Sequence, residues 1–407
     1  MAQLGPFEPA PLLAVAVSGG AASLATALLA EAWARRRGGQ VLGLIVDHGL
    51  RAEAAAEAAL THDRLAACGI AAQVLALQDL RHGPGLAERA RAARYAALES
   101  ACAAAGCLHL LTGHHRLDQA ETVMIRALGH SGNAGLAGMP ALATLGRVRL
   151  LRPLLGIAPA RLRDLLRDAG LGWVEDPSNG NPAALRARLR GAARGAEADL
   201  AAAACRAGSA RADLERAVAA ELAERASLRP EGFALLSPGR LRPETLAALI
   251  QAVGGAEFPP ASAPLLALAA CPRPGTLAGV RLLPAGRLGP GWLLVREERA
   301  VAGPSPARAG LLWDGRFRIS GTPPAGLQIG ALGAMAARLP ATGGLPSVVR
   351  RTMPGLWDGK FLVTVPHLLY RAAPISGAEA PSVCVSFEPR RPLAGAPFCP
   401  ALLPPTG

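Results

Sequence analysis

The residues from Ala14 to Ser23, AVAVSGGAAS, combine an apolar run with two adjacent glycines and a helical pattern that follows them. A strand that ends in such a turn can bind a phosphate, because glycines let the backbone approach closely and the N–H groups at a helix start face the anion. The pattern predicts a nucleotide phosphate site at Ser18, Gly19 and Gly20. An ordinary tight turn has the same composition, so other residues must decide between the two interpretations.

Two further groups of polar residues also follow apolar runs. Asp47 and His48 come directly after Val41 to Val46, and His114 comes shortly after Leu108 to Leu111. The carboxyl ends of parallel strands meet at one edge of a sheet, where ligands bind. A phosphate turn, an acidic residue and a histidine at such ends would share one crevice, and this convergence favours a nucleotide site.

The elements that must position these residues alternate between strand and helix along the first half of the chain. This alternation predicts an α/β fold, with a parallel sheet and helices on both of its faces. Strands are expected over residues 12–17, 41–46, 73–77 and 108–111, and helices over 23–37, 52–68, 86–105, about 118–128 and 161–169.

The second half of the chain predicts smaller domains. Residues 192–225 are rich in alanine and charge, which indicates a long helix leading out of the first domain. A strand at 233–236, a helix at 243–253 and a hairpin formed by 276–283 and 292–296 would follow. We therefore expect three segments: a catalytic domain (1–190), a helical linker with an α+β domain (191–302) and a small C-terminal domain (303–407).

Composition restricts the class of partner. The chain has 407 residues, of which 51% are hydrophobic and 18% charged, and its net charge is +13. Such a basic chain is typical of proteins that bind a polyanion such as nucleic acid, and the charge is nearly all arginine. The seven cysteines form no CxxC pair, and no apolar run is long enough to span a bilayer. We expect a cytoplasmic protein without a membrane partner or structural zinc.

The most specific segment is GHHRLDQAETVMIRALGHSGNAGLAGMP, from Gly113 to Pro140. Together with the glycine turn and several shorter motifs, it resembles the tRNA(Ile)-lysidine synthetase family of the PP-loop (N-type ATP pyrophosphatase) superfamily. The resemblance is strong over residues 12–190 and looser beyond. The shorter motifs are DHGLR (47–51), ARAARY (90–95), RPLL (152–155), WVEDPSN (173–179) and LRARLR, which ends at Arg190.

The resemblance implies a two-step ligation on an isoleucine tRNA with a CAU anticodon. ATP adenylates the oxygen on carbon 2 of the wobble cytidine and releases pyrophosphate, and the ε-amine of L-lysine then displaces AMP to form lysidine. The cofactors would be ATP and Mg²⁺. Binding of the ATP phosphates and the nucleotide is expected from Ser18, Gly19, Gly20, Ala21, Ala22, Ser23, Asp47 and His48.

Catalysis is expected from His114, Asp118 and Glu121, with Asp118 and Glu121 as metal ligands. The acids near this helix start could equally be plain caps, and the histidines could be turn residues. Contacts with tRNA or substrate are expected from Arg91, Arg94, Asp176, Asn179, Arg186 and Arg190; for the first two, which share one helical face, a solvated basic surface is the alternative. A homodimer remains open.

Three positions depart from the family pattern. Ala22 stands where the family has an aspartate in S-G-G-x-D-S, Leu117 replaces the first of two adjacent acids, and Ala187 replaces an asparagine. Two lost acids in one site leave a second reading open, in which the chain is a catalytically degenerate tRNA-binding homologue. A PP-loop thiolase is disfavoured, because such relatives commonly use paired cysteines.

Overall fold

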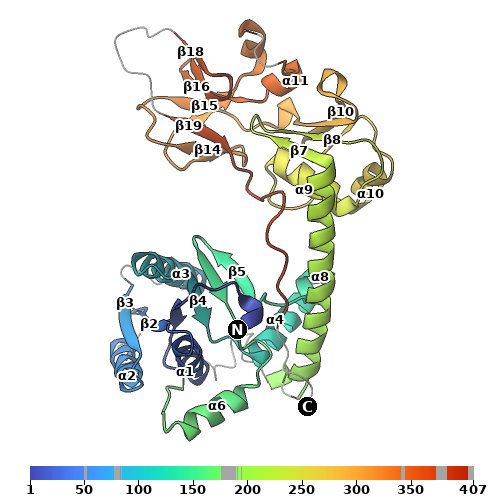
Figure 1. Cartoon of the computed structure of the whole chain (residues 1–407). Helices are drawn as coiled ribbons and strands as arrows, with labels where there is room; N and C mark the ends of the chain where they lie inside the picture. Colours follow the sequence, from blue (N-terminus) through green and yellow to red (C-terminus); the bar gives the residue numbers. More distant parts are fainter. Residues whose placement is uncertain are drawn as a thin grey trace. The chain divides into compact units, whose positions relative to one another are not determined.

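The computed structural model describes residues 1–49, 53–77, 83, 85–175, 189, 191–193, 195–340, 344–372 and 383–401. The chain forms two compact units, Met1–Leu214 with Pro397–Gly407, and Glu215–Ala396. This division differs from the three expected segments. Figure 1 shows the helices and strands of each unit.

The first unit contains a six-stranded sheet in the order β3-β2-β1-β4-β6-β5. All neighbouring strands are parallel except β5, which pairs antiparallel with β6. The predicted α/β fold is thus confirmed. The strands are β1 (Leu12–Ala16), β2 (Gln40–Asp47), β3 (Ala71–Ala76), β4 (His109–Thr112), β5 (Leu142–Leu145) and β6 (Val148–Leu151).

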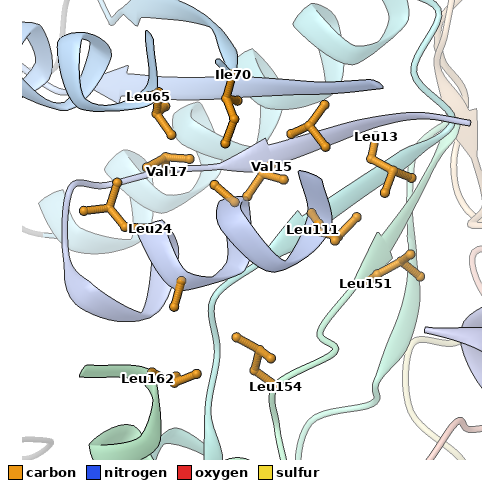
Figure 2. Close-up of a cluster of buried hydrophobic side chains, with 14 of the residues drawn as sticks. Leu13, Val15, Val17, Leu24, Leu65, Ile70, Leu111, Leu151, Leu154 and Leu162 are labelled. Atoms are coloured by element: carbon orange, nitrogen blue, oxygen red, sulfur yellow. The ribbon is translucent and has the colours of Figure 1, made fainter. Parts of the chain in front are cut away.

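Helices cover both faces of this sheet, as Figure 1 shows. Successive side chains of a strand point to opposite faces, and β1 follows this rule. Leu13 and Val15 enter a core shared with α1, α2 and α6, which Figure 2 shows, whereas Ala14 enters a core under α3. The helices are α1 (Ala21–Arg35), α2 (Ala54–Ala67), α3 (Leu86–Ala104), α4 (Arg116–Leu128), α5 (Asn133–Leu136) and α6 (Pro159–Asp168).

The long helix α8 (Glu197–Arg225) starts five residues later than the sequence predicts. Gly195 adopts a left-handed φ of +87°, which an alanine-rich helix cannot continue through. Its N–H donates to the Glu197 carboxylate at 2.7 Å. The boundary between the two units falls inside α8, after Leu214.

The second unit is built on a five-stranded sheet of order β7-β8-β11-β10-β9, a second of order β12-β15-β16-β17-β18 and a three-stranded sheet β13-β14-β19. The expected strand over 276–283 is interrupted by a turn at Ala278 and Gly279, both at positive φ. The first sheet comprises β7 (Ala226–Arg229), β8 (Phe233–Leu236), β9 (Gly275–Leu277), β10 (Val280–Pro284) and β11 (Trp292–Arg296), packed with α9 (Pro243–Gly254) and α10 (Ser262–Ala270).

One apolar core joins the segments on either side of residue 303. Phe233, Leu293 and Val295 pack in the same cluster as Val349 and Met353. This core therefore includes residues from both of the segments that the sequence analysis separates at residue 303. The remaining elements are β12 (Ser305–Pro306), β13 (Leu312–Trp313), β14 (Phe317–Ser320), β15 (Gln328–Ala331), α11 (Ser347–Arg350), β16 (Pro354–Asp358), β17 (Phe361–Val365), β18 (Tyr370–Arg371) and β19 (Cys384–Phe387).

Two findings concern disulfides and membrane-spanning helices. The seven cysteines are all free thiols. Within the described residues, no helix combines the length and the apolar character that a bilayer crossing needs.

Candidate active site

The glycine turn after β1 is held in shape by its own residues. Gly19 adopts a left-handed φ of +79°, and a Cβ there would lie 2.5 Å from the Thr61 hydroxyl oxygen. The Ser18 N–H donates to the Ser23 hydroxyl oxygen at 3.1 Å, and that hydroxyl donates to the Gly20 carbonyl at 2.9 Å. Ser23 therefore closes the turn, so its first role is to shape the backbone that would face a phosphate.

The first turn of α1 opens toward this site. Gly20 is the N-cap and has no side-chain cap, and Ala21 and Ala22 follow it. The first N–H groups of an α-helix have no partner inside the helix and attract anions. The turn thus has the backbone geometry of an anion site, although Ala22 supplies no carboxylate.

Gly113 brings the end of β4 against this same helix start. A Cβ on Gly113 would lie 2.8 Å from the carbonyl carbon and oxygen of Ala22 and 2.9 Å from the Ser23 nitrogen. Only glycine allows so close an approach without a shift of the backbone. The structure therefore places the segment that begins at Gly113 beside the predicted phosphate turn.

Asp47 and His48 lie at the end of β2, next to β1 in the sheet. The Asp47 carboxylate accepts from the Gly49 N–H at 2.9 Å. His48 has a buried Nδ1 without a hydrogen-bond partner. Burial lowers the pKa of His48, Arg94 lowers it further, and Asp47 opposes the shift, so Arg94 of α3 faces the end of β2.

His114 follows β4 and accepts or donates a hydrogen bond at Nδ1 with the Thr112 hydroxyl, 2.9 Å away. Its pKa is lowered to about 4, chiefly by burial; Asp118 opposes this, while Arg152, Arg94 and Arg91 add to it. The imidazole is consequently neutral at pH 7. Three guanidinium groups lie close enough to act on one ring.

Asp118 lies in the first turn of α4, as expected, whereas Glu121 does not. Asp118 is the third residue of α4 and forms a capping box with His115: the His115 N–H donates to the carboxylate at 2.9 Å, and the Asp118 N–H donates to the His115 ring at 3.4 Å. Glu121 lies in the second turn, not the first as predicted, and is only 3% exposed. Asp118 has a structural role as a cap, whereas the position of Glu121 is not that of a cap.

A cluster of cations lies beside His114. On α3, the guanidinium carbons of Arg91 and Arg94 lie 5.1 and 5.3 Å from the centre of the Tyr95 ring. Arg152, directly after β6, is 8% exposed and donates to the Pro140 carbonyl at 2.8 Å. Burial lowers the pKa of Arg152; Tyr95 opposes this shift and Arg91 adds to it.

Sequence reasoning assigned no role to Tyr95 and Arg152. Tyr95 ends the motif ARAARY and Arg152 begins the motif RPLL. These motifs are the sequence signal by which the two residues could have been identified. Arg152 is buried and Tyr95 partly buried, and their approach to each other depends on how α3 packs against β6, which the sequence alone does not reveal.

The segment that follows α6 approaches the phosphate turn. The Val174 N–H donates to the Gly19 carbonyl at 2.9 Å, and the Trp173 indole donates to the Glu175 carboxylate at 2.7 Å. The WVEDPSN motif therefore begins at the turn. Asp176, Asn179, Arg186 and Arg190 lie outside the described residues.

The described part of the chain contains no group of three or more His, Cys, Asp or Glu side chains arranged for a metal. Mg²⁺ commonly takes only one or two carboxylates together with substrate phosphates and water. Asp118 and Glu121, one helical turn apart on α4, supply two oxygen donors of that kind, and Asp118 would hold the ion in addition to its capping contact with the His115 N–H. Neither carboxylate is without a partner in the structure.

Comparisons with family models, curated proteins and solved structures found the following similarities. A family model described as the PP-loop domain matches residues 2–193. The tRNA(Ile)-lysidine synthase of Bradyrhizobium sp. strain BTAi1 is 43% identical over 187 residues, 46% of this chain and 52% of that protein. Among solved structures, the U34-tRNA thiolase NcsA from Methanococcus maripaludis matches at 17% identity and a TM-score of 0.42, over 50% of this chain and 72% of that one.

The chain spans about half the length of the first curated relatives that it matches. A longer match is found with the tRNA(Ile)-lysidine synthase of Ruegeria pomeroyi, which is 34% identical over 385 residues, 88% of this chain and 89% of the relative. That match includes both structural units. The chain therefore belongs to the tRNA(Ile)-lysidine synthase family.

Proposed function

We propose that this protein ligates L-lysine to carbon 2 of the wobble cytidine of tRNA(Ile) with a CAU anticodon, at the expense of ATP. The observation that carries the proposal is the contact of Gly113 with the first turn of α1. It sets the phosphate turn and the start of α4, with its histidine and carboxylates, side by side. A reaction that joins nucleotide activation to attack by an amine needs both parts within one site.

In the first step the cytidine oxygen attacks the α-phosphorus of ATP, and pyrophosphate leaves. The turn from Ser18 to Ser23 would hold the departing phosphates through backbone N–H groups and the positive end of α1. Asp47 and His48, at the adjacent strand end, would contact the nucleotide. Ser23 keeps the turn closed.

In the second step the lysine ε-amine attacks carbon 2 and AMP leaves, so the amine must first lose a proton. His114 is a weak base in the free protein, because its pKa is about 4. Glu121 is the better candidate to orient the amine and accept its proton, because it is a carboxylate buried on α4, the helix that begins beside the phosphate turn. His114, neutral at pH 7, would serve as a hydrogen-bonding group at the base.

Asp118 and Glu121 would hold Mg²⁺ together with the ATP phosphates. The bound ion supplies charge neutralisation at those phosphates. The basic charge of the chain, +13 overall, supports tRNA as the macromolecular substrate, because neutralisation of phosphates drives such binding.

The test is incorporation of labelled lysine into a tRNA(Ile) transcript. We expect incorporation that needs ATP and magnesium and that disappears when the wobble cytidine is replaced by uridine. Ala22 and Leu117, which replace family acids, favour one alternative: a homologue that binds tRNA without catalysis. Binding of the transcript without any lysine incorporation or pyrophosphate release would establish that alternative.

A further inference from the structure

Arg152 is a buried cation with no anionic partner among the described residues. It is 8% exposed, and its Nη1 atom donates to the Pro140 carbonyl at 2.8 Å. Its Nε atom is buried and has no hydrogen-bond partner. Burial of a charge without a counter-ion is costly, so such an arginine is expected where a ligand brings the anion.

Other unpartnered polar atoms lie around it. The Tyr95 hydroxyl faces Arg152 without a hydrogen bond of good geometry, and the Arg94 Nε atom is also buried and unpartnered. Asp118 is the carboxylate that, like these arginines, acts on the charge of His114. It already caps α4. The cluster therefore has an excess of donors and of positive charge.

The position of Arg152 separates it from the phosphate turn. Arg152 follows β6 and the turn follows β1, with β4 between them. Two strand spacings amount to roughly 10 Å, so phosphates held at the turn lie closer to β1 than to the strand that carries this guanidinium. A second anionic group of the bound substrates must reach it.

Two anionic groups of the substrates remain, a tRNA phosphodiester and the carboxylate of lysine, and the burial of Arg152 favours the second. A tRNA phosphodiester is flanked by two nucleotides and suits an exposed cation such as Arg91. The carboxylate of a free amino acid is a small terminal group and can reach a side chain that is only 8% exposed. Arg also offers two parallel N–H donors, which match a carboxylate.

We propose that Arg152, supported by the Tyr95 hydroxyl, binds the α-carboxylate of the lysine substrate. This inference rests on the proposed function. It makes Arg152 the residue that selects an amino acid over a simple amine and fixes the end of lysine opposite to the attacking ε-amine.

The experiment compares binding of L-lysine and of cadaverine, which is lysine without its carboxylate, by calorimetry with the full-length protein. Wild type should bind lysine at least about tenfold more tightly than cadaverine. Arg152→Met should bind both equally and raise the lysine Kd at least about tenfold, while Arg152→Lys should recover part of the preference. Tyr95→Phe should raise the lysine Kd severalfold.

Arg149→Met is the matched control, because Arg149 lies on β6 and its guanidinium is satisfied by the carbonyls of Leu4, Gly5 and Pro6. It should bind lysine like wild type. If Arg152→Met does not fold, Arg152→Lys and Tyr95→Phe carry the test.

An unchanged lysine preference in folded Arg152 variants would overturn the inference and leave the proposed function standing. A weaker affinity for tRNA with normal lysine binding would reassign Arg152 to a phosphodiester and also overturn it. If wild type neither binds lysine nor incorporates it into tRNA, the proposed function itself fails.

Discussion

Glu121 is the buried carboxylate on which the proposed chemistry depends most. It is 3% exposed and lies in the second turn of α4, one turn beyond the capping residue Asp118. Glu121→Gln keeps the size and hydrogen-bonding capacity but removes the charge. We expect turnover to fall at least about a hundredfold, the scale of a lost acid–base or metal contact, with tRNA affinity little changed.

The measurements are steady-state lysine incorporation and tRNA binding. Glu99→Gln is a suitable control, because the Glu99 carboxylate accepts from the Arg147 N–H and lies outside the proposed machinery. Normal turnover of Glu121→Gln together with a lower melting temperature would assign Glu121 a purely structural role.

Ala22 replaces a family aspartate in the first turn of α1. An aspartate there would gain from the helix N-terminus and would add a carboxylate near the phosphates. We expect Ala22→Asp to lower the magnesium concentration needed for half-maximal AMP release and to raise turnover about tenfold, which is about 1.4 kcal/mol of barrier. Leu117→Asp should add to the gain, without strict additivity.

Magnesium titrations of the single and double variants check this expectation. If neither the magnesium dependence nor turnover changes, another group has taken over the role of the lost acids, or the site no longer performs the chemistry.

His114 should make the stability of the first unit depend on pH. Its pKa in the folded chain, about 4, lies below the ordinary 6.5, so the unfolded chain binds a proton first on acidification. The free energy of unfolding should therefore be fully maintained above pH 6.5 and fall as the pH drops toward 4, by at most about 3 kcal/mol from this residue. Denaturant unfolding at several pH values measures the slope.

His114→Gln separates this effect from other histidines with lowered pKa values, such as His48 and His109. The variant should show a flatter pH dependence between pH 4 and 6.5 than wild type. An identical dependence would show that the pKa of His114 is the same in the folded and the unfolded chain.

At the scale of elements, the close packing of β4 against α1 decides whether the site exists. A methyl group on Gly113 would lie 2.8 Å from Ala22 backbone atoms, which cannot move without shifting the helix start. Gly113→Ala should therefore cost about 1–3 kcal/mol of stability and weaken ATP binding more than tRNA binding.

Gly132→Ala provides the matched control, since Gly132 has an ordinary φ of −65° and no atom within 4 Å of an added Cβ. Thermal unfolding and ATP titration of both variants distinguish the two positions. Equal effects of both substitutions would mean that the contact at Gly113 is relaxed without consequence for the phosphate turn.

At the scale of the whole molecule, the second unit should unfold as one body. Leu293 of β11 and Val349 of α11 belong to one apolar core, and Val349 is fully buried. Leu293→Ala and Val349→Ala should each lower the stability of the same transition, by about 2–5 kcal/mol for leucine and less for valine. Calorimetry of the full chain measures the transitions.

The exposed Phe361 of β17, 70% accessible, offers the comparison, because Phe361→Ala should change stability by less than about 0.5 kcal/mol. Separate transitions for Leu293→Ala and Val349→Ala would restore a boundary near residue 303 and count against a shared core.

The sequence by itself determined the first four strands and five of the helices of the first unit, and the strand ends that carry polar residues, but it did not predict α5, β5 or β6. This was possible because apolar periodicity and glycine turns are local signals, and β1, β2 and α3 fall within a few residues of their expected bounds. The motifs also sufficed to assign the family.

Only the tertiary structure determined which of those residues pack together and which shift the pKa of another residue. Arg91 and Arg94 lower the pKa of His114 only because α3 packs against β2 and β6, and Arg152 adds to this effect only because β6 lies beside β4. The shared core of the second unit likewise joins residues more than fifty positions apart in the chain. Burial and through-space electrostatics depend on such distant neighbours, and a local pattern carries no information about them.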